Sequence, residues 1–169
     1  MEKTKLFMKK IDSPLGKIIL LATEKSLCLV EFYNSKYTNN NIEKVKKYFN
    51  GEIIEKNNDI LNETEKQLNE YFKGERKDFN IPLEMIGTEF QKKIWNILLE
   101  IPYGKTISYE EQSIRYRNVK AIRAVANANS KNLIAIIIPC HRVIGKNGKL
   151  TGYAGGLDKK KWLLNFEKK

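Results

Sequence analysis

The stretch of sequence that decides the fold is SYEEQSIRYRNVKAIRAVANAN, residues 108–129. Its first four residues, Ser108 to Glu111, form a capping-box pattern that predicts the start of a helix. A further helix is predicted from about Val119 to Asn129 by the spacing of its apolar residues. Two short helices in succession are typical of a helix-turn-helix, although an ordinary helical hairpin would show the same pattern.

The second of these helices has two different faces. The predicted core face consists of Val119, Ile122, Val125 and Ala126. The other face carries Lys120, Arg123, Ala124, Asn127 and Lys131. A basic face edged by small side chains favours contact with DNA, although the pattern also occurs in helices that bind nothing.

The rest of the C-terminal half is predicted to be mainly helical. Thr88 to Gln91 is another capping box, and Phe90, Ile94, Ile97 and Leu98 follow as an apolar stripe. Residues 133–138 are expected to be a buried strand or extended segment, and residues 145–156, which are rich in glycine, a loop or hairpin. Asp158 is expected to cap a final helix that carries Trp162, Leu163 and Phe166.

The N-terminal half reads as strands followed by helices. Residues 7–11, 17–22 and 27–32 are short apolar or β-branched stretches separated by turn residues, which predicts a small antiparallel meander. After a polar loop at residues 37–41, apolar spacing predicts helices from Ile42 to Phe49 and from Asn62 to Phe72. The stretch at 79–86 reads as a linker. We therefore expect an α+β chain with a domain at 1–87 and another at 88–169.

Composition limits the classes of function. The chain of 169 residues carries 31 basic and 20 acidic residues, a net charge of +11, of which +1 belongs to residues 1–87 and +10 to residues 88–169. Such asymmetry favours a polyanion, with nucleic acid preferred over a membrane surface. No apolar run is long enough to span a bilayer and no signal peptide is evident, so we expect a cytoplasmic protein without a membrane partner. Two cysteines and one histidine exclude a disulfide framework and most zinc sites, so no metal is expected.

The residues able to do nucleophilic chemistry are concentrated in Ile138-Pro139-Cys140-His141-Arg142-Val143. A thiol reacts as the thiolate and needs a base or cation nearby, and His141 is the chain's single histidine. The alternative is an inert buried thiol, as expected for Cys28 in an apolar strand. Neighbours in an extended chain point to opposite faces, so the imidazole could require a bridging water to reach the thiol. Residue spacing does not choose the acid that would orient His141.

Several ordered motifs resemble the alkylated-DNA–protein-cysteine alkyltransferases, which repair O6-alkylguanine. The run Pro139 to Val143 resembles their active-site signature. The other similar segments are Phe90–Trp95, Ile101–Tyr109, Ala121–Val125, Gly152–Leu157 and Trp162–Glu167, and Ser13-Pro14-Leu15-Gly16 is like their opening hairpin. The resemblance implies a ribonuclease H-like N-terminal domain of structural role and a winged-helix-like C-terminal domain that binds DNA and accepts the alkyl group.

The resemblance also implies the chemistry. Cys140 would take the alkyl group in a single displacement and keep it as a thioether, so each molecule would act once, as a methyltransferase without a cofactor. His141 would remove the thiol proton through a water, and Glu167 would orient His141. Tyr109 would donate to N3 of the leaving guanine.

For DNA, the resemblance implies that double-stranded DNA binds through its minor groove with the alkylguanine flipped out. Arg123 would fill the vacated stack, on a face that also carries Lys120, Ala124 and Asn127. Asn132 would tie the turn before the active site. The flipped base would contact Val143, Tyr153, Ala154 and Gly155, and the protein would act as a monomer at the nucleoid.

This chain departs from the family pattern in two places. Leu133 stands where many members have proline, and Ala154 stands where some have serine, which would remove a hydroxyl contact but keep a backbone one. The zinc site that some relatives carry in the N-terminal domain has no counterpart here. Two other functions are considered: a non-catalytic protein that binds the lesion, which would lack the acceptor cysteine, and a transcription regulator, which would need a further DNA-binding domain.

Overall fold

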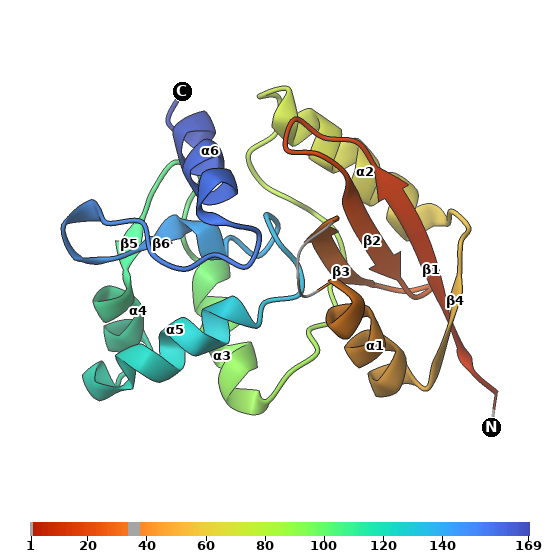
Figure 1. The fold of residues 1–169 in the computed structure, drawn as a ribbon, viewed down its shortest axis with the longest axis horizontal. Helices are drawn as coiled ribbons and strands as arrows, with labels where there is room; N and C mark the ends of the chain where they lie inside the picture. Colours follow the sequence, from red (N-terminus) through yellow and green to blue (C-terminus); the bar gives the residue numbers. More distant parts are fainter. Residues whose placement is uncertain (1, 34–37) are drawn as a thin grey trace. The chain divides into compact units, whose positions relative to one another are not determined.

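A computed structural model describes residues 2–33 and 38–169 of the chain (Figure 1). The fold divides into two compact units, Met1–Ile86 and Gly87–Lys169. The first contains a sheet with helices and the second is mainly helical, so the predicted α+β class is confirmed. None of the helices in the described ranges is long and apolar enough to cross a membrane.

The N-terminal unit is built on a four-stranded sheet with the order β3-β2-β1-β4. Its elements are β1 (Thr4–Ile11), β2 (Ile18–Ala22), β3 (Leu27–Phe32), α1 (Thr38–Phe49), β4 (Gly51–Ile54) and α2 (Asp59–Phe72). β1, β2 and β3 are antiparallel neighbours, which confirms the predicted meander. All residues of β2 and β3 are buried, so this sheet is the core of the unit.

Two predictions in this unit were wrong. β4 was not predicted, and it pairs parallel to β1, so the sheet is mixed rather than purely antiparallel. Its four residues are too few to show a pattern in the sequence, and Gly51 lies where a Cβ would approach the Leu6 side chain. The polar run expected as a loop at 37–41 is helical from Thr38 onward, while Tyr37 lies outside the described residues.

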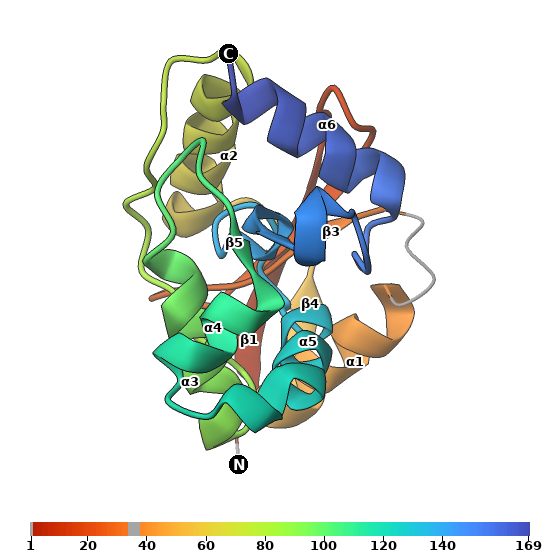
Figure 2. The same cartoon turned by 90° about the vertical axis from the view of Figure 1, so that its left-hand side faces the viewer.

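The C-terminal unit contains four α-helices and three short 3-10 turns, and Figure 2 shows α3, α4 and α5 close together. Its elements are α3 (Glu89–Leu99), β5 (Ile107–Ser108), α4 (Tyr109–Arg115), η1 (Val119–Ala121), α5 (Ile122–Ser130), η2 (Cys140–Arg142), β6 (Val143–Ile144), η3 (Lys146–Gly148) and α6 (Leu157–Glu167). The Thr88 capping box is present in full, and the Ser108 side chain accepts a hydrogen bond from the amide of Glu111. Both predicted helix starts are therefore confirmed.

α5 is held on α3 by apolar contacts and on α4 by polar ones. Val125 and Ala128 pack with Ile94 and Ile97 of α3 in one cluster. In contrast, the buried residues of α4 are Gln112 and Ser113. The Gln112 and Asn129 side chains exchange two hydrogen bonds of 2.9 and 2.7 Å across the α4–α5 contact. A buried amide pair of this kind joins the helix-turn-helix because each amide satisfies the other.

The structure corrects the predicted core face of α5. Val119 and Ile122, expected inside, are 56% and 37% exposed. The face toward the core is instead formed by Ala121, Val125 and Ala128. The chain turns at η1 before α5 begins, and this changes the register that a single continuous helix would have had.

Two more segments differ from expectation. Residues 133–138 are a series of turns rather than a strand, with Ile136 at a φ of 70°. Asp158 does not cap α6, which begins after Gly156 (φ 102°) without a side-chain cap. The apolar run at 133–138 is buried as predicted, but burial alone does not make a chain extended.

Candidate active site

A short parallel strand pair brings the two ends of the site together. Ile107 of β5 pairs with Val143 of β6. Tyr109 directly follows β5, and the 3-10 turn η2 with Cys140 directly precedes β6. Because the pair is parallel, Tyr109 and Cys140 lie beyond opposite ends of this two-residue ladder, and both side chains line one pocket although they are 31 positions apart in the sequence.

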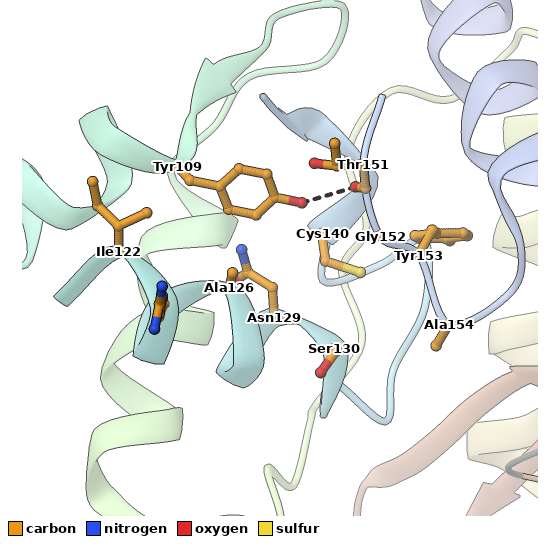
Figure 3. A pocket seen from close by; sticks show the side chains of 11 residues that line it. Tyr109, Ile122, Ala126, Asn129, Ser130, Cys140, Thr151, Gly152, Tyr153 and Ala154 are labelled. Atoms are coloured by element: carbon orange, nitrogen blue, oxygen red, sulfur yellow. Dashed lines mark hydrogen bonds between the residues drawn. The ribbon is translucent and has the colours of Figure 1, made fainter. Parts of the chain in front are cut away.

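Cys140 lies in a pocket of about 310 Å³ within the C-terminal unit, a size at the lower end of small-molecule sites, which run from roughly 300 to 1,000 Å³. One wall comes from α5 and the other from the loop at 151–154, as Figure 3 shows. The lining residues are Tyr109, Ile122, Arg123, Ala126, Asn129, Ser130, Cys140, Thr151, Gly152, Tyr153 and Ala154. The pocket thus contains the predicted nucleophile together with Tyr109, Arg123, Tyr153 and Ala154.

The turn before Cys140 is tied by Asn132. Its Nδ2 donates to the Ile138 carbonyl at 2.9 Å and lies 3.4 Å from the Cys140 sulfur, while its Oδ1 accepts from the Ile134 amide at 2.9 Å. Burial raises the pKa of the Cys140 thiol, and the hydrogen bond from Asn132 opposes that rise. The resting thiol is therefore protonated at neutral pH, so its reaction needs a base.

His141 belongs to a buried network with a carboxylate and a guanidinium. His141 is fully buried, and its Nε2 lies 2.8 Å from Oε2 of Glu167. Arg142 donates from Nε to Oε1 of Glu167 at 2.8 Å, from Nη2 to Oε2 at 3.1 Å, and from Nη1 to the Ile101 carbonyl at 2.7 Å. Burial on its own would raise the pKa of Glu167, but its contacts with His141 and Arg142 bring it down to about 2.

This network fixes the proton on the imidazole. A carboxylate only accepts hydrogen bonds, so Nε2 of His141 must carry the proton that it donates to Glu167. Burial also lowers the pKa of His141, against the effect of Glu167, which keeps the ring neutral. Nδ1 then holds the free lone pair, and within the described ranges it is buried without a hydrogen-bond partner. His141 is consequently set up as a base at Nδ1.

The second wall of the pocket is held by Lys160 of α6 and by Tyr109. The Lys160 ammonium donates to the carbonyls of Thr151 at 2.8 Å and Gly152 at 3.3 Å. The Tyr109 hydroxyl donates to the same Thr151 carbonyl at 3.0 Å (Figure 3). Burial lowers the pKa of Lys160 to about 8 and raises the pKa of Tyr109. Both groups therefore remain protonated at neutral pH.

A glycine allows the final helix to reach the site. Gly104 has a φ of 79°, and a Cβ there would lie 3.0 Å from the Glu167 carbonyl oxygen. A side chain at this position would be strained and would also press on the end of α6. The turn after α3 is thus shaped to let Glu167 approach His141.

The remaining predicted residues fall into two groups. Lys120, Ala124 and Asn127 are exposed on the outer side of η1 and α5, beside the pocket but outside its lining. Val143 is fully buried in β6, and Gly155 directly follows the last lining residue in the sequence. Neither residue lines the pocket.

Sequence reasoning missed Lys160, Gln112 and Asn129. Lys160 stands between two other lysines, so nothing in the sequence marks it as buried. Gln112 and Asn129 are 17 positions apart and become partners only when α4 meets α5. A polar residue at a position with core spacing is the one signal that could have pointed to the amide pair.

The sequence between Gln112 and Leu157, which supplies most of the pocket lining, carries charge of one sign only. Between Gln112 and Leu157 the sequence contains eight lysines and arginines and no aspartate or glutamate. This range includes η1, α5, η2 and the loop of the pocket. The described residues contain no group of three or more potential metal ligands.

Comparison with known proteins assigns the family. The model of the 6-O-methylguanine DNA methyltransferase ribonuclease-like domain matches residues 6–85, and that of the DNA-binding domain of the same enzymes matches residues 89–169. The chain belongs to the O6-methylguanine DNA methyltransferase family. Members of this methyltransferase family are DNA-repair enzymes that transfer an alkyl group to a cysteine of the protein.

Relatives in the family cover nearly the whole chain. The methylated-DNA–protein-cysteine methyltransferase of Methanosarcina acetivorans is 48% identical over 92% of this chain and 94% of its own. That of Mycobacterium leprae is 42% identical over 95% of this chain and 91% of its own. The Mycobacterium tuberculosis O6-methylguanine methyltransferase structure matches with a TM-score of 0.83 at 39% identity, covering 96% of this chain and 93% of its own. A structure of the M. tuberculosis protein in complex with DNA matches with a TM-score of 0.82 at 38% identity, covering 96% of this chain and 92% of its own.

Proposed function

We propose that this methyltransferase repairs O6-alkylguanine in double-stranded DNA by moving the alkyl group onto Cys140. The observation that carries the proposal is the adjacency of Cys140, in an open pocket, to a buried histidine with a free basic nitrogen. The other cysteine offers no such setting, because burial raises the pKa of Cys28 to about 12. Cys140 is therefore the thiol that can be activated.

The reaction begins with removal of the thiol proton. His141 Nδ1 takes this proton through a bridging water, and the imidazolium that forms is stabilised by the Glu167 carboxylate. The Cys140 sulfur attacks the alkyl carbon, so an S–C bond forms while the bond from that carbon to O6 breaks. The electron pair of the broken bond moves into the guanine ring.

The leaving guanine needs a proton or hydrogen bond to offset its developing negative charge. Tyr109 is suited to donate to guanine N3 because its hydroxyl is protonated and lies on the pocket wall opposite α5. The thioether formed has no facile reverse reaction, so each molecule of the protein is consumed in one turnover.

The same displacement would also remove the alkyl group from O4-alkylthymine, which we propose as a second substrate.

The alkyl carbon of a stacked base cannot reach a thiol inside a pocket, so the nucleotide must flip out of the duplex. Arg123 lines the pocket at the start of α5, which suits it to fill the vacated stack from the minor groove. Lys120, Ala124 and Asn127, on the exposed side of the same segment, would contact the backbone. Val143 and Gly155 would act on the base only through the backbone.

We assign a separate role to each domain. Residues 88–169 bind DNA and accept the alkyl group, while residues 1–87 are structural. A single copy contains the whole pocket, so the protein is proposed to act as a monomer without a cofactor. Because its substrate is genomic DNA, its place of action is the nucleoid in the cytoplasm.

The test is a mass measurement after mixing the protein with duplex DNA containing O6-methylguanine. The peptide with Cys140 should become one methyl group heavier, and the lesion should disappear in equal amount. Cys28→Ala is the matched control and should still react, whereas Cys140→Ala should bind DNA without reacting. An unmodified Cys140 with the lesion intact would refute transfer and favour a protein that only binds the lesion.

A further inference from the structure

Two exposed aliphatic side chains stand beside Arg123 and have no partner in the C-terminal unit's core. Val119 is 56% exposed and Ile122 is 37% exposed. In the described part of the chain, three of the seven large apolar side chains that are exposed fall within Ile114–Ile122, at the turn of the helix-turn-helix. Single exposed apolar side chains are common on protein surfaces, whereas several of them grouped together often mark a contact surface.

The local helix geometry puts these side chains in a row. η1 is a 3-10 turn that runs into α5, and in such a turn residues three positions apart lie on the same side. Val119 and Ile122 therefore share one side, while Lys120 and Arg123 share the neighbouring side. The core side is occupied by Ala121 and the residues that follow it.

The row leads into the pocket that holds Cys140. Ile122, Ala126 and Asn129 succeed one another along α5 and all line the pocket, with Ile122 at the end nearest the start of the helix (Figure 3). Ile122 therefore forms part of the pocket lining at that end. The row is accordingly continuous with the site of the reaction.

The charged residues near Val119 and Ile122 indicate which kind of molecule binds there. Arg115 is paired with Glu111 at 3.1 Å, but Arg117, Lys120 and Arg123 lie within five positions of Ile122 in the sequence, and no acidic residue occurs between Gln112 and Leu157. A second protein chain or a hydrophobic peptide would leave these cations unmatched, whereas DNA offers phosphates on both sides of an apolar groove wall. Proteins that bind the minor groove often insert apolar wedges between base steps and thereby unstack them.

We propose that Val119 and Ile122 form an apolar wedge that enters the minor groove beside Arg123 and keeps the duplex open at the flipped nucleotide. The wedge rests on the proposed function, because it acts on the nucleotide that this function needs flipped. Val119 contacts the sugar edges, and Ile122 contacts the face of the base pair next to the gap. Arg123 supplies the polar contacts inside the gap, and the two aliphatic side chains hold its rims apart.

The test compares the rate of alkyl transfer from duplex DNA with the rate from the free base O6-benzylguanine. Because Ile122→Ala removes three aliphatic carbons that become half-buried against DNA, the ratio of the two rates should fall about tenfold. Val119→Thr keeps the shape but replaces one methyl group by a hydroxyl, so it should also lower the ratio. Leu99→Ala is the matched control, because Leu99 is 42% exposed on α3, loses the same three carbons and lies outside the site.

Salt dependence separates an apolar wedge from a phosphate contact. The slope of DNA affinity against salt should be unchanged in Ile122→Ala and smaller in Lys120→Ala. The wedge is refuted if Ile122→Ala keeps the wild-type ratio, if it slows both reactions equally, or if its defect depends on protein concentration, as a contact between copies would require. Absence of transfer in the wild-type protein would instead refute the proposed function.

Discussion

Replacing Glu167 by glutamine tests the buried network that supports His141. The substitution keeps the size of the side chain and removes its charge, which leaves the Arg142 guanidinium buried at 6% exposure without its carboxylate. Removal of one partner from a buried ion pair usually costs about 3–5 kcal/mol. The lowering of the pKa of Glu167 from 4.5 to about 2 reflects the same contacts and corresponds to a contribution of the same order, about 3 kcal/mol at neutral pH.

The stability that Glu167→Gln loses should depend on pH in a defined direction. The folded-state pKa of Glu167 is below its ordinary value, so its contribution to stability is complete above pH 4.5 and disappears as the pH falls toward 2. Glu167→Gln should therefore be about 3 kcal/mol less stable than wild type at pH 7, which corresponds to a melting temperature lower by roughly 6–12 °C. The difference should shrink below pH 4.5, where wild type gains the proton that glutamine imitates.

The assay is denaturant unfolding followed by tryptophan fluorescence. Both tryptophans, Trp95 and Trp162, lie in the unit Gly87–Lys169, so the signal reports the unit that contains the network. Glu100→Gln is the control, because Glu100 is exposed and should change stability little. A loss under about 1 kcal/mol, or one that stays constant between pH 7 and pH 3, would show that Glu167 is not the charged partner described.

The remaining predictions concern the base, the joint between the helices and the pocket wall. Because the pKa of His141 is lowered, the single-turnover rate of transfer to Cys140 should be flat near neutral pH and fall only below about pH 6.5. A rate that already falls as the pH drops below about 8 would contradict the role of His141 as the base. Gln112→Leu should lower the free energy of unfolding by about 1–3 kcal/mol by orphaning Asn129, and adding Asn129→Leu should restore most of it in a double-mutant cycle; additive losses would show that the pair is not coupled. Lys160→Met should slow transfer from both DNA and free base by about tenfold, the equivalent of one lost hydrogen bond to a charged group, and Lys160→Arg should recover part of the rate; equal rates for all three proteins would exclude a role for the ammonium.

The fold was predictable where local chemistry dominates. The turn residues between β1, β2 and β3 and the capping residues Thr88 and Ser108 act within a few positions, so they are legible in the sequence. β4 was missed because its pairing with β1 joins segments more than 40 positions apart. The segment at 133–138 was misread because its apolar run reports burial, whereas its turns are fixed by Asn132.

For the candidate site, the sequence by itself determined which groups can react. One histidine beside one of two cysteines, in a half with a charge of +10, already indicates Cys140 as the candidate reactive thiol and favours a polyanion as its partner. These conclusions follow from residue types and their local order, which do not depend on which distant segments the fold brings into contact.

Only the tertiary structure decided how those groups are placed. It brings Glu167 to His141 across 26 positions and so determines which imidazole nitrogen is basic. It buries Lys160 behind the pocket wall and turns Val119 and Ile122 outward beside Arg123. Each of these depends on contacts between distant segments, and the energy of such contacts is set by burial and geometry that no short stretch of sequence contains.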